Sequence, residues 1–473
     1  MMTACWLKNI SSKNHFYEYL LITISSILLG IWAVKNTIAL RNILLGLGFV
    51  LGLAYIYSAY RQKVFKGIQF KNWLPIILMS LMLLWVPVHY LVLSRFPEVQ
   101  LQELKSTWLR TFLAMVVGVS AGLALKKNVK LMNILWVGIS LSFLYLFFQY
   151  VPRAYASKNI FVIDWYGGYY IYIGKINGVL MGTILFCGLG ATWIDHLKSK
   201  AFAMSFANTF LPLIGMALTL YAYVFIFDTR NGLGLSALLV LFWTLYAGVW
   251  FLSQGNLKKL LLKFKGVLLL IIMALGIFSW LAYQQTKHNS GWVTMIEDAK
   301  IATQLEKYPN WQNPAKYGYP KTDTGREVAG NTYERVAWAS AGIGLIPENM
   351  LGAGVLARPF TRLLQEKYPG ATSPSTHSAW IEFTLAFGLP AFILMFGSLV
   401  SILYLTISSP HLYFRVSVVS IALILMLLYT LGELSTQHGV EVLFYFMALL
   451  AGLRMPIGLN APDKIGSVIQ PSH

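Results

Sequence analysis

The chain has 473 residues, of which 57% are hydrophobic and only 12% are charged. Because soluble globular proteins usually carry about 25% charged residues, this composition excludes a soluble enzyme and a disordered regulator. Only two cysteines occur, Cys5 and Cys187, which excludes a disulfide-stapled secreted domain and predicts no zinc site. The composition therefore predicts an all-α polytopic membrane protein.

The net charge is +19, from 37 Lys and Arg against 18 Asp and Glu. In a soluble protein such an excess would indicate nucleic acid as a partner. Here the basic residues mostly flank apolar runs, where they anchor helices to anionic headgroups and set the topology. We therefore predict membrane lipids and no nucleic acid as partners. The excess positive charge also suits a polyanionic substrate.

Twelve apolar segments approach the roughly 20 residues that a helix needs to cross the hydrocarbon. The first is too long for a cleaved signal peptide, so we predict that it remains as a helix. The predicted spans are residues 17–34, 43–60, 73–94, 110–125, 131–151, 171–193, 203–227, 232–253, 266–284, 379–406, 412–431 and 437–453.

The distribution of positive charge predicts the orientation of these spans. With both termini in the cytoplasm, eighteen Lys and Arg residues lie on the cytoplasmic side and nine lie in the short segments of the other side. The chain then divides into nine helices in residues 1–284, one large periplasmic loop in residues 285–378, and three helices with a cytoplasmic tail in residues 379–473.

The large loop has ten basic and eight acidic residues, close to the balance of a soluble protein, and contains helix signals. The pattern of residues 291–307 predicts one helix. A second helix begins at Asn331, where Glu334 completes a capping-box spacing. A third begins at Pro359 and ends before Pro369-Gly370. We therefore expect a structured loop, because loops longer than about 15 residues are usually functional or disordered.

Residues 311–320, Trp-Gln-Asn-Pro-Ala-Lys-Tyr-Gly-Tyr-Pro, form an aromatic and proline-rich turn region of this loop. The faces of these rings are suited to stacking on sugar rings. They are equally suited to the lipid headgroup layer, where Trp and Tyr are enriched. The sequence leaves both interpretations open.

Ionisable residues gather at the far-side ends of the spans, whereas the middles of the spans are almost free of acids. Transporters usually carry charged or broken helices near the midplane, so this pattern favours a site at the outer membrane boundary, under the large loop. Such a place suits a lipid-linked substrate. The residues are Arg153, Asp164, Asp228, Arg230, Arg335, His377, Glu382, Glu433, His438 and Glu441.

Two of these positions have features expected of a catalytic site. Arg230 lies in Phe-Asp-Thr-Arg-Asn-Gly at a junction between spans, and its guanidinium either clamps phosphates or reaches the membrane surface paired with Asp228. His377, at the entry of a span, is suited either to proton transfer or to a structural role. Glu382 lies five residues later, about 140° around a helix, so a partner that orients His377 must come from elsewhere.

The sequence predicts no metal site and no cofactor. It contains no DxD pair, no HExxH motif and no nucleotide-binding glycine loop. His438 and Glu441 are three residues apart and are expected to hydrogen-bond on one helix face as a structural pair. The reaction must therefore use a donor that was activated beforehand.

The order of these features resembles that of the O-antigen ligase family of bacterial inner membranes, which shares its loop region with O-antigen polymerases and pilin O-oligosaccharyltransferases. The resemblance covers the whole topology, but its short motifs lie within residues 227–235 and 331–390. They are the Arg-Asn-Gly junction, Arg335-x-x-Trp338, Pro347-Glu-Asn-Met-Leu-Gly352-Ala-Gly354, and His377 entering a helix toward Gly388-Leu-Pro.

The resemblance implies a multi-helix membrane glycosyltransferase that moves a polysaccharide from undecaprenyl diphosphate to lipid A–core on the periplasmic face, without a metal. By position, Arg230 and Arg335 correspond to diphosphate-binding arginines and His377 to the essential histidine; Arg153 is the third basic residue that we assign to the donor diphosphate. Two departures affect the surroundings of His377, because Ser378 replaces a common Asn and Ala386 replaces a common acid.

The chemistry of the residues agrees with this assignment. Arginines neutralise a departing diphosphate without proton transfer, and His377 is expected to take the proton of the acceptor hydroxyl, so that direct attack inverts the anomeric carbon. The alternatives are an O-antigen polymerase or a pilin O-oligosaccharyltransferase that uses the same donor. A lipid-linked glycan flippase is disfavoured by the few charges within the spans.

Overall fold

The structure is a computed structural model that describes residues 2–158, 173–198, 206–252, 272, 276–284, 286, 294–407 and 412–456. Within these residues the regular structure is helical, apart from two isolated β-bridges, Val34 with Ile173 and Lys321 with Glu327. The all-α prediction is confirmed.

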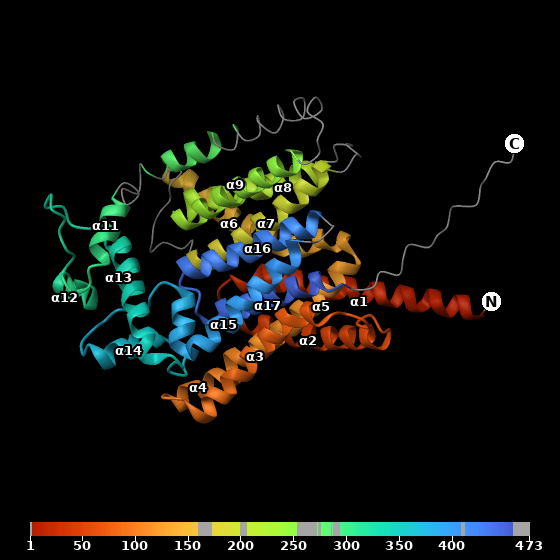
Figure 1. Ribbon diagram of the computed structural model, residues 1–473. Coiled ribbons are helices and arrows are strands. Elements are labelled where there is room, and N and C mark those ends of the chain that lie inside the picture. The colour runs from red at the N-terminus through yellow and green to blue at the C-terminus, as the bar shows by residue number, and fades with distance from the viewer. Residues whose placement is uncertain are drawn as a thin grey trace.

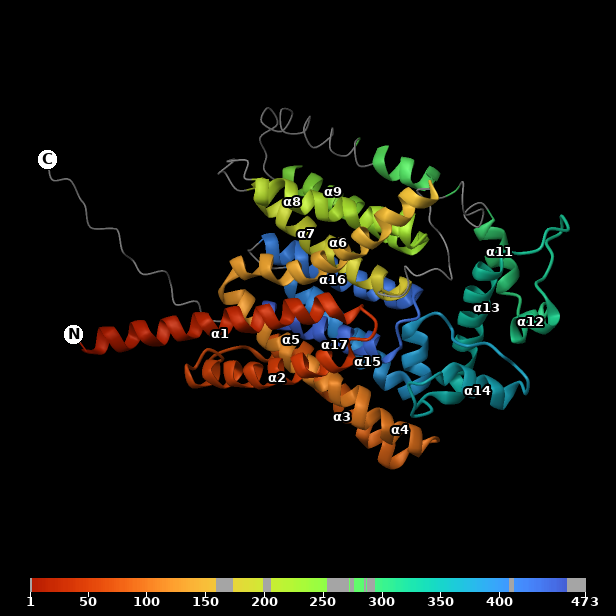
Figure 2. The same cartoon turned by 180° about the vertical axis from the view of Figure 1, so that it is seen from behind.

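Long helices lie side by side in a bundle, and a smaller helical unit covers one end of it, opposite the amino-terminal end of α1 (Figures 1 and 2). The bundle contains α1 (Met2–Trp32), α2 (Ile38–Arg61), α3 (Phe70–Val92), α4 (Pro97–Glu103), η1 (Leu104–Trp108), α5 (Leu109–Lys127), η2 (Val129–Leu131), α6 (Met132–Ser157), α7 (Lys175–Lys198), α8 (Phe206–Tyr221), η4 (Ala222–Ile226), α9 (Arg230–Leu252), α15 (Ala379–Ile407), α16 (Leu412–Leu431) and α17 (Gln437–Arg454). The end unit contains α11 (Met295–Ala302), η6 (Pro309–Gln312), α12 (Pro314–Tyr317), α13 (Gly330–Leu345), η7 (Pro347–Asn349) and α14 (Pro359–Lys367).

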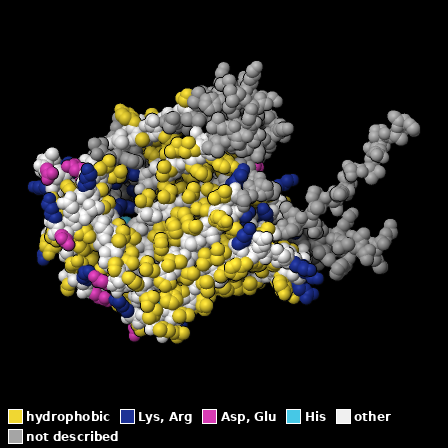
Figure 3. Space-filling view, viewed as in Figure 1, with side chains coloured by type: hydrophobic (Ala, Val, Ile, Leu, Met, Phe, Trp, Pro, Cys, Tyr) yellow, Lys and Arg dark blue, Asp and Glu magenta, His cyan; other side chains and the backbone are white. Residues whose placement is uncertain are grey.

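Seven helical segments among the described residues are long and apolar enough to cross a membrane. Figure 3 shows hydrophobic side chains over the face of the bundle and charged side chains toward its ends, as expected for a membrane-embedded protein. Of the predicted span 266–284, only residue 272 and residues 276–284 lie within the described part. The seven segments are Ile38–Arg61, Phe70–Val92, Pro97–Lys127, Val129–Ser157, Lys175–His196, Ala379–Ile407 and Tyr413–Leu431.

Small residues hold α5 and α17 together at the centre of the bundle. A methyl group added at Gly118 would meet the carbonyl oxygen of Tyr445, and one added at Gly122 would meet that of Leu449. Gly452 likewise faces the backbone of α5. Because the spacing of Gly118 and Gly122 is the small-xxx-small pattern of close helix pairs in membranes, these glycines set the distance between the two helices.

The end unit is hydrogen-bonded to the bundle at a kink in α15. Gly388 has φ 77°, a conformation that favours glycine, and the proline two residues later has no N–H to bond the carbonyl oxygen of Ala386. Instead, Gly354 N donates to Ala386 O (2.7 Å) and Ala353 N donates to Leu385 O (2.9 Å). The Gly352-Ala-Gly354 motif is therefore hydrogen-bonded to the backbone just before Gly388.

The end unit has its own small core, but two of its predicted helix boundaries are wrong. Residue Ala329 occupies the cap position of α13 without a side-chain bond. Asn331 Oδ1 accepts from Arg335 Nε (2.6 Å), and Glu334 Oε1 accepts from the Tyr319 hydroxyl (2.8 Å), so the predicted capping box does not form. The side chains of Asn331 and Glu334 instead bond residues outside the first turn of α13.

The helix predicted for residues 291–307 is shorter in the structure, where α11 spans Met295–Ala302 and residues 291–293 lie outside the described part. The chain turns after Ala302 and folds back on itself, with Trp311 Nε1 bonded to Leu305 O (3.1 Å). The third predicted helix is confirmed as α14, which begins at Pro359 and ends before Pro369-Gly370.

Trp311 lies inside the core of the end unit and is only 3% exposed. Its ring packs edge-on against Tyr368, with 5.6 Å between the ring centroids. Neither interpretation of the aromatic region, sugar stacking or contact with headgroups, therefore holds for Trp311. The tryptophan instead contributes to the apolar core of the end unit.

We predict that Gly122→Ala lowers the thermal stability of the protein in detergent. The added methyl group collides with backbone atoms of α17, and overpacking costs roughly 1–3 kcal/mol. The matched control is Gly46→Ala on α2, where a methyl group meets no atom within 4 Å and alanine favours the helix by roughly 0.5–1 kcal/mol. Equal melting temperatures for both variants would contradict this account of the α5–α17 contact.

Candidate functional site

Three helices of the candidate site meet at the carboxyl-terminal end of α16. The carbonyl oxygen of Leu431 accepts from Arg335 Nη1 and from Asn231 Nδ2, at 3.3 Å in each case. Carbonyls in the last turn of a helix have no partner within the helix and must bond elsewhere. One helix end therefore holds both α13, through Arg335, and the first turn of α9, which begins at Arg230.

A tight turn places Arg230. The helix α8 ends in the wider π-helical turn η4, and Asp228 follows with φ 44°, a left-handed conformation in which Asp is among the more tolerated residues. Lys175 Nζ at the start of α7 donates to Asp228 O (2.8 Å). The turn therefore places Arg230 at the start of α9 and brings the ammonium of Lys175 to the same junction.

Positive charge is concentrated at this junction. The pKa of Arg335 is lowered from its usual value, first by burial of the guanidinium and then by the nearby charge of Arg230, with Glu433 opposing the shift. A guanidinium still stays charged at neutral pH. Lys175 interacts electrostatically with both arginines. The arrangement is suited to a ligand with several negative charges.

His377 lies two residues before the start of α15 and has φ 56°, a left-handed conformation in which histidine is found more often than most residues. Its ring stacks on Trp338, with 5.4 Å between centroids and 20° between planes. Trp338 Nε1 donates to Trp311 O (2.8 Å). The tryptophan is thus held in place and fixes the plane of the imidazole.

The partner of His377 comes from the segment between α16 and α17. Glu433 Oε2 lies 3.4 Å from His377 Nδ1, and Ala379 N donates to Gly432 O (3.1 Å), which ties the two segments together. Glu382 instead accepts from Thr376 N (2.6 Å). The prediction that the partner of His377 lies outside its own helix is confirmed. With a carboxylate at Nδ1, the proton of a neutral imidazole favours Nδ1, which leaves Nε2 as a base.

Glu433 is ionised more readily than an ordinary glutamic acid. Its pKa is lowered, first by the hydrogen-bonding interaction with His377 and further by the hydroxyl of Ser375 and the charge of Arg335, while burial opposes the shift. The single carboxylate therefore interacts with the histidine and with one of the arginines. This links the proton-accepting and the anion-binding parts of the site.

A cavity of 380 Å³ lies beside this pair. Glu433 and Ser375 line it together with Thr436, Arg358, Glu103 and Thr107. The lining is rich in hydroxyl and carboxyl groups, which bond the hydroxyl groups of polar ligands. A ligand in this cavity would lie within reach of the residues that surround His377.

The site residues expected from the sequence are brought together in part. Arg230, Arg335 and His377 converge around the end of α16, whereas Arg153 is half-buried near the end of α6 and its role stays a prediction. Asp164 lies outside the described residues. Sequence reasoning named Glu433 among the ionisable residues at the far-side span ends but gave it no role, and it did not assign Lys175 to the site.

The backbone of Ser378, which stands where an Asn is common, forms local hydrogen bonds next to His377. Ser378 N donates to Thr376 Oγ1 (3.3 Å), and Ser378 O accepts from Glu382 N (3.1 Å) to begin α15. Within the described part of the chain, no group of three or more His, Cys, Asp or Glu side chains is arranged to hold a metal ion.

No known protein family is matched. Comparison with protein-family models and with curated proteins gave no match to this chain. The assignment of a function therefore depends on the residues of the site and on their chemistry.

We predict that Glu433→Gln weakens the pH dependence of stability. Because the folded-state pKa of Glu433 is lowered, its carboxylate stabilises the fold above the unfolded pKa, and this contribution is lost as the pH falls through the folded pKa. In thermal unfolding between about pH 6 and about pH 3, the variant should lose less stability than the wild type. Glu306→Gln, at an exposed acid of the end unit, should follow the wild type. Parallel curves for all three proteins would contradict the prediction.

Proposed function

We propose that the protein is a membrane glycosyltransferase of the O-antigen ligase type. It transfers a polysaccharide from undecaprenyl diphosphate to lipid A–core at the periplasmic face of the bacterial inner membrane. In this proposal the chain crosses the membrane about twelve times, both termini are cytoplasmic, and residues 285–378 form the periplasmic loop over the site.

The observation that carries the proposal is the convergence of Arg230, Arg335 and His377, which lie far apart in the sequence, around the end of α16. Two arginines supply fixed positive charge for a diphosphate, and Lys175 lies at the same junction. A histidine with an ionised carboxylate at Nδ1 supplies a base. A group transfer with a diphosphate leaving group needs both of these functions.

The proposed reaction is a single displacement. The acceptor hydroxyl oxygen attacks the anomeric carbon of the donor glycan as its bond to the diphosphate oxygen breaks, so that the configuration at this carbon is inverted. His377 Nε2 takes the proton of the hydroxyl, and Glu433 stabilises the resulting imidazolium. Arg230 and Arg335 stabilise the negative charge that develops on the departing undecaprenyl diphosphate.

A transfer assay with the purified full chain tests the function. The protein is given an undecaprenyl-diphosphate-linked glycan together with purified lipid A–core, in the presence of a chelator. We expect glycan to appear on lipid A–core. Elongation of the lipid-linked glycan instead would show a polymerase, and labelling of an added pilin would show a protein glycosyltransferase. Either result would overturn the ligase assignment.

We predict that His377→Ala and His377→Asn both abolish useful transfer, since a positioned general base contributes about 10²–10⁴-fold. Asparagine tolerates the left-handed backbone at this position, so the second variant separates loss of the base from a change of conformation. Both proteins should be present in the membrane at wild-type levels. Transfer by His377→Asn near the wild-type rate would disprove the role of His377 as the base.

We predict that Arg335→Lys lowers kcat/KM for the donor by about 10–100-fold, because a charge-assisted hydrogen bond contributes roughly 1.5–3 kcal/mol and lysine lacks the planar fork. The matched control is Arg95→Lys, at an exposed arginine paired with Glu366 at 3.3 Å. The control should retain wild-type kinetics. Full activity of Arg335→Lys would exclude a clamp that depends on the guanidinium geometry.

A further inference from the structure

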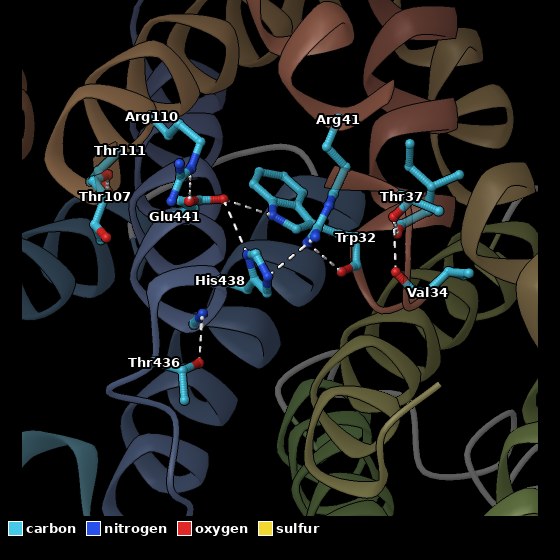
Figure 4. Close-up of polar contacts among 12 residues, drawn as sticks. Trp32, Val34, Thr37, Arg41, Thr107, Arg110, Thr111, Thr436, His438 and Glu441 are labelled. Atoms are coloured by element: carbon cyan, nitrogen blue, oxygen red, sulfur yellow. Dashed lines mark hydrogen bonds and ion pairs between the residues drawn. The ribbon is translucent and has the colours of Figure 1, made fainter. Parts of the chain in front are cut away.

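A second charged cluster lies within the bundle, where α1, α2, α5 and α17 meet (Figure 4). At its centre Glu441, which is 2% exposed, accepts from Arg110 Nε (2.5 Å) and from Trp32 Nε1 (3.3 Å). A buried carboxylate is stable only when it is paired and hydrogen-bonded in this way. Glu441 therefore ties the start of α5 to the end of α1.

The charge of His438 follows from its neighbours. Arg41, which is 5% exposed, donates through Nη1 to Trp32 O (3.1 Å) and lies with Nη2 3.2 Å from His438 Nε2. Because a guanidinium has no acceptor, Nε2 must accept and the imidazole is neutral. His438 Nδ1 is 3.7 Å from Glu441 Oε2, longer than a hydrogen bond. The hydrogen bond expected between these two residues is therefore not formed.

A cavity of 230 Å³ opens beside this cluster between α2 and the η1–α5 segment. Its polar lining consists of Asn42, Lys105, Ser106 and Arg110, and its remaining lining is leucine side chains of α2 and α5. Three cations, Arg41, Arg110 and Lys105, lie in or next to the cavity against the one carboxylate of Glu441. The local charge is therefore positive.

The cavity lies where the surface changes from polar to apolar. Lys105 and Asn42 are exposed, and the residues that follow each of them present apolar side chains outward: Ile43 is 59% exposed on α2 and Leu109 is 52% exposed on α5. Exposed apolar side chains on a membrane-embedded bundle face acyl chains. The basic residues of the cavity thus lie at the level of the lipid headgroups.

We propose that this cavity binds an anionic phospholipid of the bilayer. Lys105 and Arg110 bind the phosphodiester, Ser106 and Asn42 offer hydrogen bonds to the headgroup, and the leucine side chains contact the upper part of an acyl chain. A phosphate at the membrane surface gains about 1 kcal/mol from each nearby Lys or Arg. The combination of a cationic mouth and an apolar floor favours a lipid phosphate over a free anion.

The π-helical turn η1 separates this cavity from the larger one. Lys105 and Ser106 line the phospholipid cavity, whereas Thr107 and the preceding Glu103 line the cavity beside Glu433. A lipid at Lys105 therefore contacts the opposite side of the turn from the candidate site. The proposal concerns binding alone and does not depend on the proposed enzymatic function.

Binding of lipids to the purified full chain tests the proposal by native mass spectrometry. The probes are phosphatidylglycerol, phosphatidylcholine, lipid A and inorganic phosphate. We expect the wild type to retain phosphatidylglycerol in preference to phosphatidylcholine, and Lys105→Gln to weaken this retention about fivefold, which corresponds to the loss of about 1 kcal/mol. Lys71→Gln, at an exposed lysine at the start of α3, should bind as the wild type does.

A second variant, Asn42→Trp, fills the mouth of the cavity from an exposed position and should reduce retention of phosphatidylglycerol without removing a charge. Equal retention by wild type and both variants would overturn the proposal. Retention of lipid A that exceeds that of phosphatidylglycerol and is weakened by Lys105→Gln, or displacement of phosphatidylglycerol by inorganic phosphate, would also overturn it. The first would indicate a different lipid class and the second a site for the anion alone.

Discussion

The candidate site depends on the unpaired carbonyl groups at the end of α16. The last carbonyls of a helix have no partner within the helix, and each needs a donor from elsewhere. Leu431 O takes donors from Arg335 and Asn231, and Gly432 O takes the backbone N–H that begins α15. The bonds that satisfy this helix end therefore also set the positions of α9, α13 and His377.

The arginines near the end of α16 suit an anionic ligand. Glu433 is the carboxylate nearest to His377, and it also interacts with Arg335. Lys175 also interacts with Asp228, and Arg335 also interacts with Glu334, while the two arginines keep a fixed positive charge at neutral pH. Fixed positive charge of this kind stabilises a departing diphosphate without reorganisation during the reaction, while the acid is close enough to orient the imidazole. Glu433 thus contributes to both parts of the site.

The sequence predicted the helices far better than it predicted their meeting points. Hydropathy located the long helices because apolar length alone decides which segments can lie in a membrane, and Pro359 marked the start of α14 correctly. The capping box at Asn331 failed because Arg335 takes the Asn331 side chain. The role of Trp311 was missed because the sequence does not show that the end unit builds its own core.

The contacts of the site were also hidden from the sequence for a physical reason. Leu431 and Gly432 contribute backbone carbonyls, which every residue has, so no residue type marks them. Gly352, Gly354 and Gly388 were noted as motifs, but only the structure shows that Gly354 N bonds a carbonyl released by the kink at Gly388. Arg230, Arg335 and His377 could be predicted individually, since charge near a span end is visible in a sequence.

Two π-helical turns precede the two positively charged regions, and this arrangement has a structural cause. In η4 the bond from Phe227 N to Ala222 O (2.8 Å) closes a wider turn, after which Asp228 leaves the helix and Arg230 begins the next one. In η1 the wider turn directs Lys105 and Thr107 to different cavities. Such turns are rare and occur frequently at functional sites. Because a π turn holds more residues than an α turn, it rotates the side chains that follow it, Arg110 in α5 among them.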